Sequence, residues 1–296
     1  MTPPFVLDDV LARFARGIDA ALERQRADGA VVRADWGLDD PGGTCSLVAL
    51  CVFAEAQRRH RPEALEGAPP EPVLRDAVAR ALDSLEAYQR PSGLTDLRDC
   101  NFDSSPDAGF ILQALCPAVA AWRDHGGDDP NWRPLTERLD AFLRRMVAGT
   151  LDGGFHTPNH RWVIASGLAQ AARLYPDLDV RATVDAYLAE GIDLDPDGFY
   201  LERSAGVYDA ICDRSLLLLD LAMGCPEARD AAMANLRANR FLLEADGTVE
   251  TGLSRRQDYG TRSVPAGLIA PYLLGGLVAD DPELVGIAAF LWEKSG

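Results

Sequence analysis

The chain has 296 residues, of which 47% are hydrophobic, and a formal net charge of −17. The hydrophobic fraction is sufficient for a sizeable core, so we expect a folded globular protein. The strong negative charge argues against nucleic acid or an anionic membrane surface as a partner, and an acidic ligand would need a local cluster of arginines.

The first residues carry no basic segment followed by an apolar run, which is what a signal peptide requires. No stretch approaches the roughly 18 apolar residues of a membrane span. We therefore expect a cytoplasmic protein that does not associate with a membrane.

Apolar residues recur at helical spacing along almost the whole chain, and strand patterns are nearly absent. The pattern predicts helices at 5–28, 43–60, 71–89, 106–124, 131–149, 160–175, 179–191, 205–224, 226–242, 263–279 and 282–293. Turns rich in glycine, proline and aspartate recur about every 50 residues, at 90–94, 151–155, 195–199 and 244–248. The period is that of a helical hairpin, and hairpins of this kind bury their apolar faces only by packing on their neighbours.

The helices alternate in character. Segments 43–54, 106–121, 162–172 and 215–223 are apolar on most faces, whereas 71–89, 131–149 and 226–240 carry many charged residues. This alternation favours a closed α/α toroid of about five to six hairpins over an open solenoid, with the apolar helices on the inner wall. We expect one domain over 1–296, and the segments that precede the inner helices would meet at one mouth.

Asn159, His160 and Arg161 stand side by side at the start of one such helix, with His156 just upstream. An asparagine in this place is often only a helix cap, and a single histidine is often structural. Two of the four histidines nevertheless fall within five residues, which favours a functional site.

In the next candidate segment Glu202 and Arg203 lie just before the helix expected at 205–224, and Tyr208 lies within its first turn. Tyr208 could be a core residue, and Glu202 and Arg203 could form an ordinary surface pair. Arg255 and Arg256 lie on a later loop, where they could be solvated or could bind a carboxylate or sulfate. Asn101 and Asp103 are candidates for substrate binding, although capping of the helix at 106–124 is the simpler interpretation.

The six cysteines, Cys45, Cys51, Cys100, Cys116, Cys212 and Cys225, have no metal-ligand spacing, which predicts free and mostly buried thiols. No phosphate loop, dinucleotide fingerprint, zinc-protease motif or nucleophile elbow is present. We therefore expect neither a metal nor another cofactor.

Asn159-His160, together with the run from Asp197-Gly198 through Glu202-Arg203-Ser204 to Tyr208, resembles the toroid domain of heparinase II/III-like and alginate-lyase-like polysaccharide lyases. The resemblance covers roughly 95–265. In such lyases a β-sandwich usually follows the toroid, and this sequence contains no such segment.

The resemblance implies an enzyme that cleaves an acidic glycan by β-elimination. Asn159, with help from Arg256, would neutralise the uronate carboxylate. His160 would remove the C5 proton and Tyr208 would protonate O4, although in some of these lyases one tyrosine does both. Glu202 would orient Arg203 or a sugar hydroxyl, and the remaining substrate contacts would come from His156, Arg161, Arg203, Arg255, Asn101 and Asp103.

Two alternatives belong to other classes. A glycoside hydrolase on the same toroid, including hydrolases of unsaturated uronides, would need two carboxylates across the cleft, with Asp103, Asp107, Glu202 and Glu250 as candidates. A non-catalytic helical-repeat protein would use the same loops only for recognition.

Overall fold

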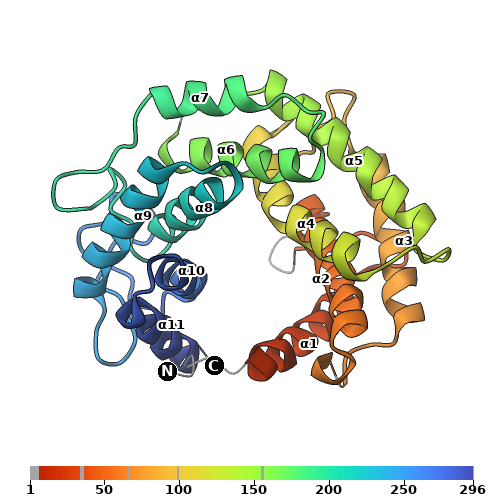
Figure 1. Ribbon diagram of the computed structural model, residues 1–296, viewed down its shortest axis with the longest axis horizontal. Coiled ribbons are helices and arrows are strands. Elements are labelled where there is room, and N and C mark those ends of the chain that lie inside the picture. The colour runs from red at the N-terminus through yellow and green to blue at the C-terminus, as the bar shows by residue number, and fades with distance from the viewer. Residues whose placement is uncertain (1–6, 34–36, 66, 99, 155–156, 296) are drawn as a thin grey trace. The chain divides into compact units, whose positions relative to one another are not determined.

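The computed structural model describes residues 7–33, 37–65, 67–98, 100–154 and 157–295. Within these ranges the protein is all-α, with eleven α-helices and no strand beyond single bridges (Figure 1). The helices are α1 (Leu7–Glu23), α2 (Pro41–His60), α3 (Glu71–Tyr88), α4 (Ser105–His125), α5 (Arg133–Asp152), α6 (Pro158–Leu174), α7 (Arg181–Ala189), α8 (Tyr208–Met223), α9 (Pro226–Asn239), α10 (Ile269–Ala279) and α11 (Pro282–Lys294). No helix in the described ranges is long and apolar enough to cross a membrane.

The eleven helices expected from the apolar period are confirmed, and the largest differences are at two ends. The helix expected over 5–28 ends at Glu23, because the chain turns at Gly29. The helix expected from 263 begins at Ile269, since Ser263 accepts a hydrogen bond from the Val249 amide and a short 3₁₀ turn, Ala266–Leu268, follows Pro265. At both ends, residues that the apolar period assigns to a helix belong instead to a turn or to a hydrogen-bonded loop.

One turn geometry recurs after odd-numbered helices. In each copy the backbone amide of the first residue donates to the carbonyl of the fifth, and the carbonyl of the first accepts from the amide of the fourth. The fourth residue is a glycine with φ between +89° and +93°. The copies are Arg26–Ala30, Arg90–Leu94, Asp195–Phe199 and Glu244–Thr248. Three of them were predicted from the sequence, the copy at 26–30 was missed, and the turn expected at 151–155 lies partly outside the described residues.

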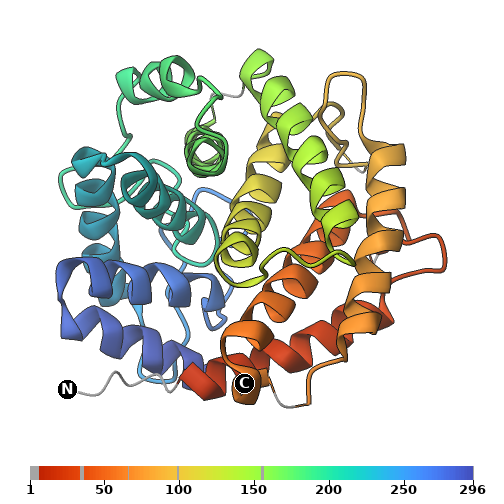
Figure 2. The same ribbon diagram turned by 45° about the vertical axis from the view of Figure 1, so that its right-hand side comes forward.

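The chain divides into two compact units. The N-terminal unit holds α1 to α5 and the residues at 170–180. Within it, α2 packs against both α3 and α4, while α3 and α5 pack against each other. Figure 2 shows α3 and α5 in this pairing. The unit therefore has two layers, one of even-numbered and one of odd-numbered helices.

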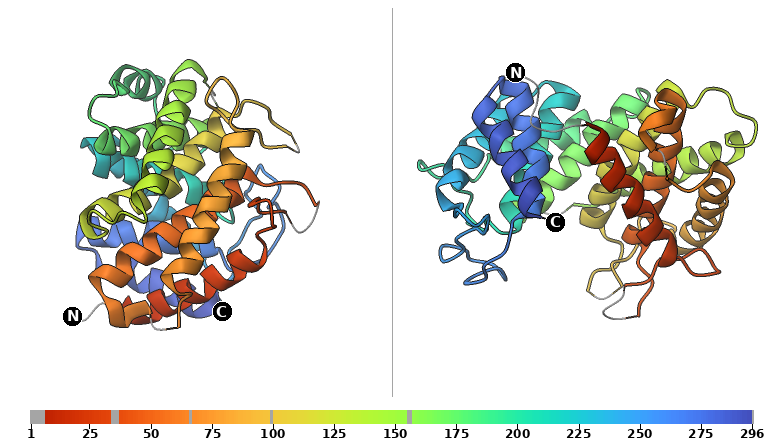
Figure 3. Two further views of the ribbon diagram at one scale, coloured as in Figure 1. Left: turned by 90° about the vertical axis from the view of Figure 1, so that its right-hand side faces the viewer. Right: turned by 90° about the horizontal axis from the view of Figure 1, so that it is seen from below.

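The C-terminal unit holds the residues at 157–169 and α7 to α11. Here α8 packs on α9 and α10, and α10 packs along α11 (Figure 3). The part of α6 in this unit is buried on every side from Arg161 to Ala169. The character expected of an inner helix is therefore found in α6, while closure of the hairpins into a toroid, and a single domain over the whole chain, stay predictions.

All six cysteines are free, in agreement with the sequence-based expectation. Four are buried in helices, and burial raises the pKa of Cys45, Cys51, Cys116 and Cys212. Cys100 is exposed in the loop before α4 and Cys225 is half-buried, which agrees with the expectation that most of the thiols are buried. The buried thiols stay protonated at neutral pH and contribute as small apolar side chains.

Candidate active site

Arg256 lies at the centre of the candidate site, in the C-terminal unit. Its Nη1 is 2.9 Å from Glu202 Oε1, and its guanidinium carbon is 4.2 Å from the ring centre of Tyr208. Hydrogen bonding to the Tyr208 side chain and the negative charge of Glu202 raise the pKa of Arg256 despite partial burial. One guanidinium thus joins the loop at 254–258 to the segment that carries Glu202 and Tyr208.

Asn159 and Glu202 are the buried members of this cluster. Asn159 is 1% exposed and Glu202 is 5% exposed. The Asn159 side-chain nitrogen donates to both carboxylate oxygens of Glu202, at 3.2 and 2.9 Å. Asn159 is therefore not a helix cap, because α6 already begins at Pro158.

This geometry changes the roles expected for Asn159 and Glu202. The amide expected to neutralise a substrate carboxylate is buried and donates to Glu202 instead. Glu202 was expected to orient Arg203, whereas it pairs with Arg256. Arg256 is the cation of this cluster that remains partly exposed, so carboxylate binding is better assigned to it.

His160 follows Asn159 in the first turn of α6 and is partly exposed. Burial, and next the positive charge of Arg256, lower the pKa of His160. The imidazole is therefore neutral at physiological pH, the form that accepts a proton. Arg256 therefore acts electrostatically on His160 and lies over the ring of Tyr208, so one guanidinium influences both candidate proton-transfer groups.

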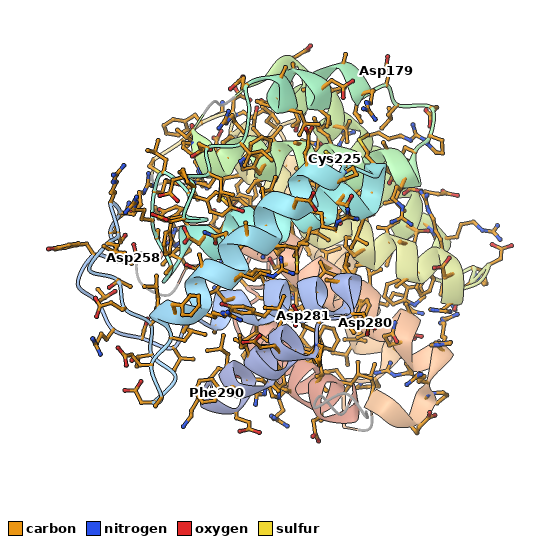
Figure 4. The ribbon with its side chains drawn as sticks, turned by 60° about the vertical axis from the view of Figure 1, so that its left-hand side comes forward. Asp179, Cys225, Asp258, Asp280, Asp281 and Phe290 are labelled. Atoms are coloured by element: carbon orange, nitrogen blue, oxygen red, sulfur yellow. The ribbon has the colours of Figure 1, made fainter. Side chains whose placement is uncertain are left out.

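Asp258 holds this arrangement together, and Figure 4 labels it in its loop. Its carboxylate accepts hydrogen bonds from Ser204 Oγ at 2.9 Å, Ser254 Oγ at 2.5 Å and the Gly206 amide at 3.1 Å. Ser204 Oγ in turn accepts from the Tyr208 amide at the start of α8, at 3.1 Å. Asp258 thus fixes the Arg256 loop against the helix that carries Tyr208, a role that no sequence motif indicates.

Three further arginines were expected to bind substrate, and two of them already have carboxylate partners. Arg161 is 7% exposed and pairs with Glu190 at 3.0 Å and Asp193 at 2.9 Å. Arg203 pairs with Asp195 at 2.7 Å. The charges of Arg161 and Arg203 are therefore neutralised within the unit, which does not favour the substrate-binding role expected for them. Arg255 is exposed and donates to the Leu201 carbonyl at 3.3 Å.

The remaining candidates lie elsewhere. Asn101 and Asp103 belong to the N-terminal unit, in the loop before α4. Asn101 donates to Ser104 Oγ at 2.7 Å, and Asp103 accepts from the Ser92 hydroxyl. Ser104 caps α4, so the capping interpretation holds for this loop, with Ser104 rather than Asp103 as the cap. His156 lies outside the described residues.

The carboxylates proposed for a hydrolase are not brought together by these contacts. Asp107 hydrogen-bonds with Ser104 in the N-terminal unit. Glu250 is bound to Arg262 at 2.6 Å and to the Gly252 amide at 2.7 Å. Glu202 is engaged by Asn159 and Arg256. Among the described residues, no group of three His, Cys, Asp or Glu side chains is arranged to hold a metal ion.

Two fully buried acids on α8 were not singled out from the sequence. Asp209 accepts from the Ser204 amide at 3.0 Å and from the Asn239 side chain at 3.2 Å. Asp213 accepts from the Tyr200 hydroxyl at 2.8 Å. Burial raises the pKa of Asp209 to about 6 and that of Asp213 well above its usual range. Both acids lie among the buried apolar residues of α8, so the apolar pattern of the sequence does not distinguish them from exposed acids on a helix.

We expect the free energy of unfolding to fall as the pH rises from about 4 to about 6. In this window the folded protein keeps a proton on Asp209 that the unfolded chain has lost, so raising the pH favours unfolding. A pKa raised from 3.8 to about 6 corresponds to about 3 kcal/mol, and Asp213 extends the fall to higher pH. Urea unfolding at half-unit steps between pH 4.5 and 7.5 measures the slope.

The variant Asp209→Asn is the control for this prediction. It keeps an acceptor for the Ser204 amide, and its NH₂ can reach the side-chain oxygen of Asn239, which accepts no hydrogen bond from a described residue. The pH slope should therefore become shallower. Equal slopes in both proteins would show that Asp209 does not titrate in this window.

Comparison of the sequence with protein-family models and with curated proteins gives no match.

Proposed function

We propose that the chain is a carbon–oxygen lyase that cleaves a uronic-acid-containing glycan by β-elimination. The observation that carries the proposal is the arrangement around Arg256 of a buried amide–carboxylate pair, a neutral imidazole and a phenol. These are the groups needed to bind a carboxylate and to move two protons, and they come from three segments distant in sequence.

In the proposed reaction, Arg256 binds the uronate carboxylate and stabilises the enolate-like charge that develops as the C5 proton leaves. Neutral His160 accepts that proton. The C4–O4 bond then breaks as the C4=C5 double bond forms, and Tyr208 gives its proton to O4. Proton transfer from the imidazolium to the phenolate, directly or through water, restores the enzyme.

Glu202 and Asn159 act on Arg256 rather than on the sugar. Glu202 fixes the guanidinium through a 2.9 Å contact at Nη1, while Nε donates to the side-chain oxygen of Gln257 at 3.4 Å. Asn159 donates hydrogen bonds from its amide to both carboxylate oxygens of Glu202.

The closed toroid that the resemblance implies forms part of this proposal. Small-angle X-ray scattering can test the toroid, because it measures the radius of gyration of the protein.

Incubation with a panel of uronate-containing polysaccharides tests the proposal. A lyase produces ultraviolet absorbance from the 4,5-unsaturated product, and that absorbance should be absent with His160→Ala. New reducing ends without this absorbance would replace the proposal by a hydrolase. Binding without either product would leave a recognition protein.

A further inference from the structure

Ser204 connects the start of α8, where Tyr208 lies, to the loop that carries Arg256. Its side chain is fully buried, and its hydroxyl makes two hydrogen bonds. It donates to Asp258 at 2.9 Å and accepts from the Tyr208 amide at 3.1 Å. On the other side of Asp258, Ser254 Oγ donates to the carboxylate at 2.5 Å and accepts from the Arg256 amide at 3.1 Å. The backbones of Tyr208 and Arg256 are therefore joined through three buried side chains.

The backbone of Ser204 is bonded to Asp209 in both directions. The Ser204 amide donates to Asp209 Oδ1 at 3.0 Å, and the Ser204 carbonyl accepts from the Asp209 amide at 3.0 Å. Arg203, the residue before Ser204, has φ of +50°, a conformation that is unfavourable for residues other than glycine. Such a backbone persists only where the surrounding structure fixes it. The two bonds between Ser204 and Asp209 fix it directly after Arg203.

The second carboxylate oxygen of Asp209 is bonded to α9, which packs against α8. Asp209 Oδ2 accepts from the Asn239 side chain at 3.2 Å, and the same amide nitrogen donates to Asn235 Oδ1 at 2.8 Å. Asn235 in turn donates to the Gly198 carbonyl at 2.9 Å. Asp209, Asn235 and Asn239 are all fully buried. Asp209 therefore ties Ser204 to α9 with one oxygen on each side, and the bonds lie where water does not weaken them.

We propose that Asp209 is a positioning residue of the candidate site, which fixes Ser204 and thereby both the start of α8 at Tyr208 and the loop of Arg256. Asp209 is fully buried, so it acts through these residues and not on the sugar. A displacement of about 1 Å between groups that act together can cost about 10²-fold in rate. The effect on turnover rests on the proposed function, whereas the arrangement of the two segments is measured without a substrate.

Hydrogen–deuterium exchange of the unliganded protein at pH 7 measures this arrangement. Four amides of the two segments donate to the side chains described above: Ser204, Gly206, Tyr208 and Arg256. Asp209→Ala should speed exchange in peptides over 202–208 and 254–258 about 10–100-fold, the effect of losing a hydrogen bond to a charged acceptor. A peptide over 212–219, inside α8, is the internal reference and should change less. Equal acceleration in all three peptides, or none in the first two, would overturn the proposal.

Asp213→Ala is the matched control for the exchange measurement. Asp213 is equally buried and lies one turn further along α8, but it accepts from the Tyr200 hydroxyl and not from Ser204. It should not loosen 254–258 relative to the reference peptide. Asp209→Asn keeps an oxygen that accepts from the Ser204 amide, so it should restore most of the protection. If Asp213→Ala loosened both segments as much as Asp209→Ala, the positioning role would be lost.

Two further variants cover the case in which Asp209→Ala does not fold. Asp209→Val leaves less empty space and offers no acceptor, so it should speed exchange in the same two peptides. Ser204→Ala removes only the hydroxyl between the Tyr208 amide and Asp258, and it should speed exchange over 254–258. Unchanged exchange over 254–258 in Ser204→Ala would break the proposed connection between Asp209 and the Arg256 loop.

Turnover separates the positioning role from the proposed reaction. On a uronate substrate that the wild-type chain cleaves, Asp209→Ala should lower kcat about 10–100-fold and change KM less, because the placement of groups that act in the transition state is lost. Asp209→Asn should lose less, and Asp213→Ala should keep the wild-type kcat. Loosened segments with a wild-type kcat would overturn the positioning role. Loosened segments in a chain whose wild type forms no unsaturated product would refute the lyase and keep Asp209 as the residue that fixes them.

Discussion

Replacing Tyr208 with phenylalanine is expected to lower kcat on a uronate substrate by about 10²–10⁴-fold, the usual contribution of a positioned acid or base. Stability should change by less than about 1 kcal/mol, since only one partly exposed hydroxyl is lost. The ring that Arg256 covers is kept, and with it the cation–π contact at 4.2 Å. Product absorbance gives kcat, and urea unfolding gives the stability.

Tyr259→Phe is the matched control, because Tyr259 lies on the same loop as Arg256 and is 66% exposed. It should leave kcat unchanged. His160→Ala should cause a loss similar to that of Tyr208→Phe, and the double variant should lose less than the product of the two, because both groups act on one transition state. A folded Tyr208→Phe protein with near wild-type turnover would return Tyr208 to a structural role.

Glu202→Ala is expected to lower the free energy of unfolding by about 3–4 kcal/mol. The change leaves the buried amide of Asn159 without its acceptor and removes the counter-charge of Arg256. Glu202→Gln should cost less, since one oxygen still accepts from Asn159. Urea unfolding at pH 7 measures all the variants.

Glu250→Ala separates this effect from the loss of any glutamate in the unit. Glu250 is 41% exposed in its side chain and pairs with Arg262 at the surface, so its removal should cost no more than about 1 kcal/mol. If Glu202→Ala were as stable as Glu250→Ala, the hydrogen bonds between Asn159 and Glu202 would not stabilise the site. Asn159 would then need another role.

The helices were predictable because their apolar period is strong and their turns contain glycine and proline. The meeting of Glu202, Tyr208 and Arg256 was partly predictable, since Glu202 and Arg256 stand on a turn and a loop and Tyr208 is the first residue of α8. The hydrogen-bond and ion-pair partners of these residues were not predictable. Nothing local indicates that Asn159 binds a carboxylate 43 residues away, because that pairing depends on how the hairpins pack.

The charges were the least predictable part. Adjacent arginines and distant acids look alike in a sequence whether they pair or stay free. Arg161 is neutralised by Glu190 and Asp193, about thirty residues further along the chain. Among the described residues, the buried Nε of Arg214 has no acceptor, although Asp213 precedes it in the sequence. Solvent exposure and pairing are set by tertiary packing, which a single sequence does not encode locally.

The recurring turn described above has a consequence for the evolution of the chain. Its glycine packs each time on an odd-numbered helix of the following hairpin: Gly29 on α3, Gly93 on α5, Gly198 on α9 and Gly247 on α11. In the first three copies a Cβ atom would meet a backbone carbonyl of that helix, at Arg80, Arg145 and Ala234. Since the joint between consecutive hairpins is the same, duplication or loss of a whole hairpin creates no new kind of junction, and such an array can change its length by gene duplication while each joint is preserved.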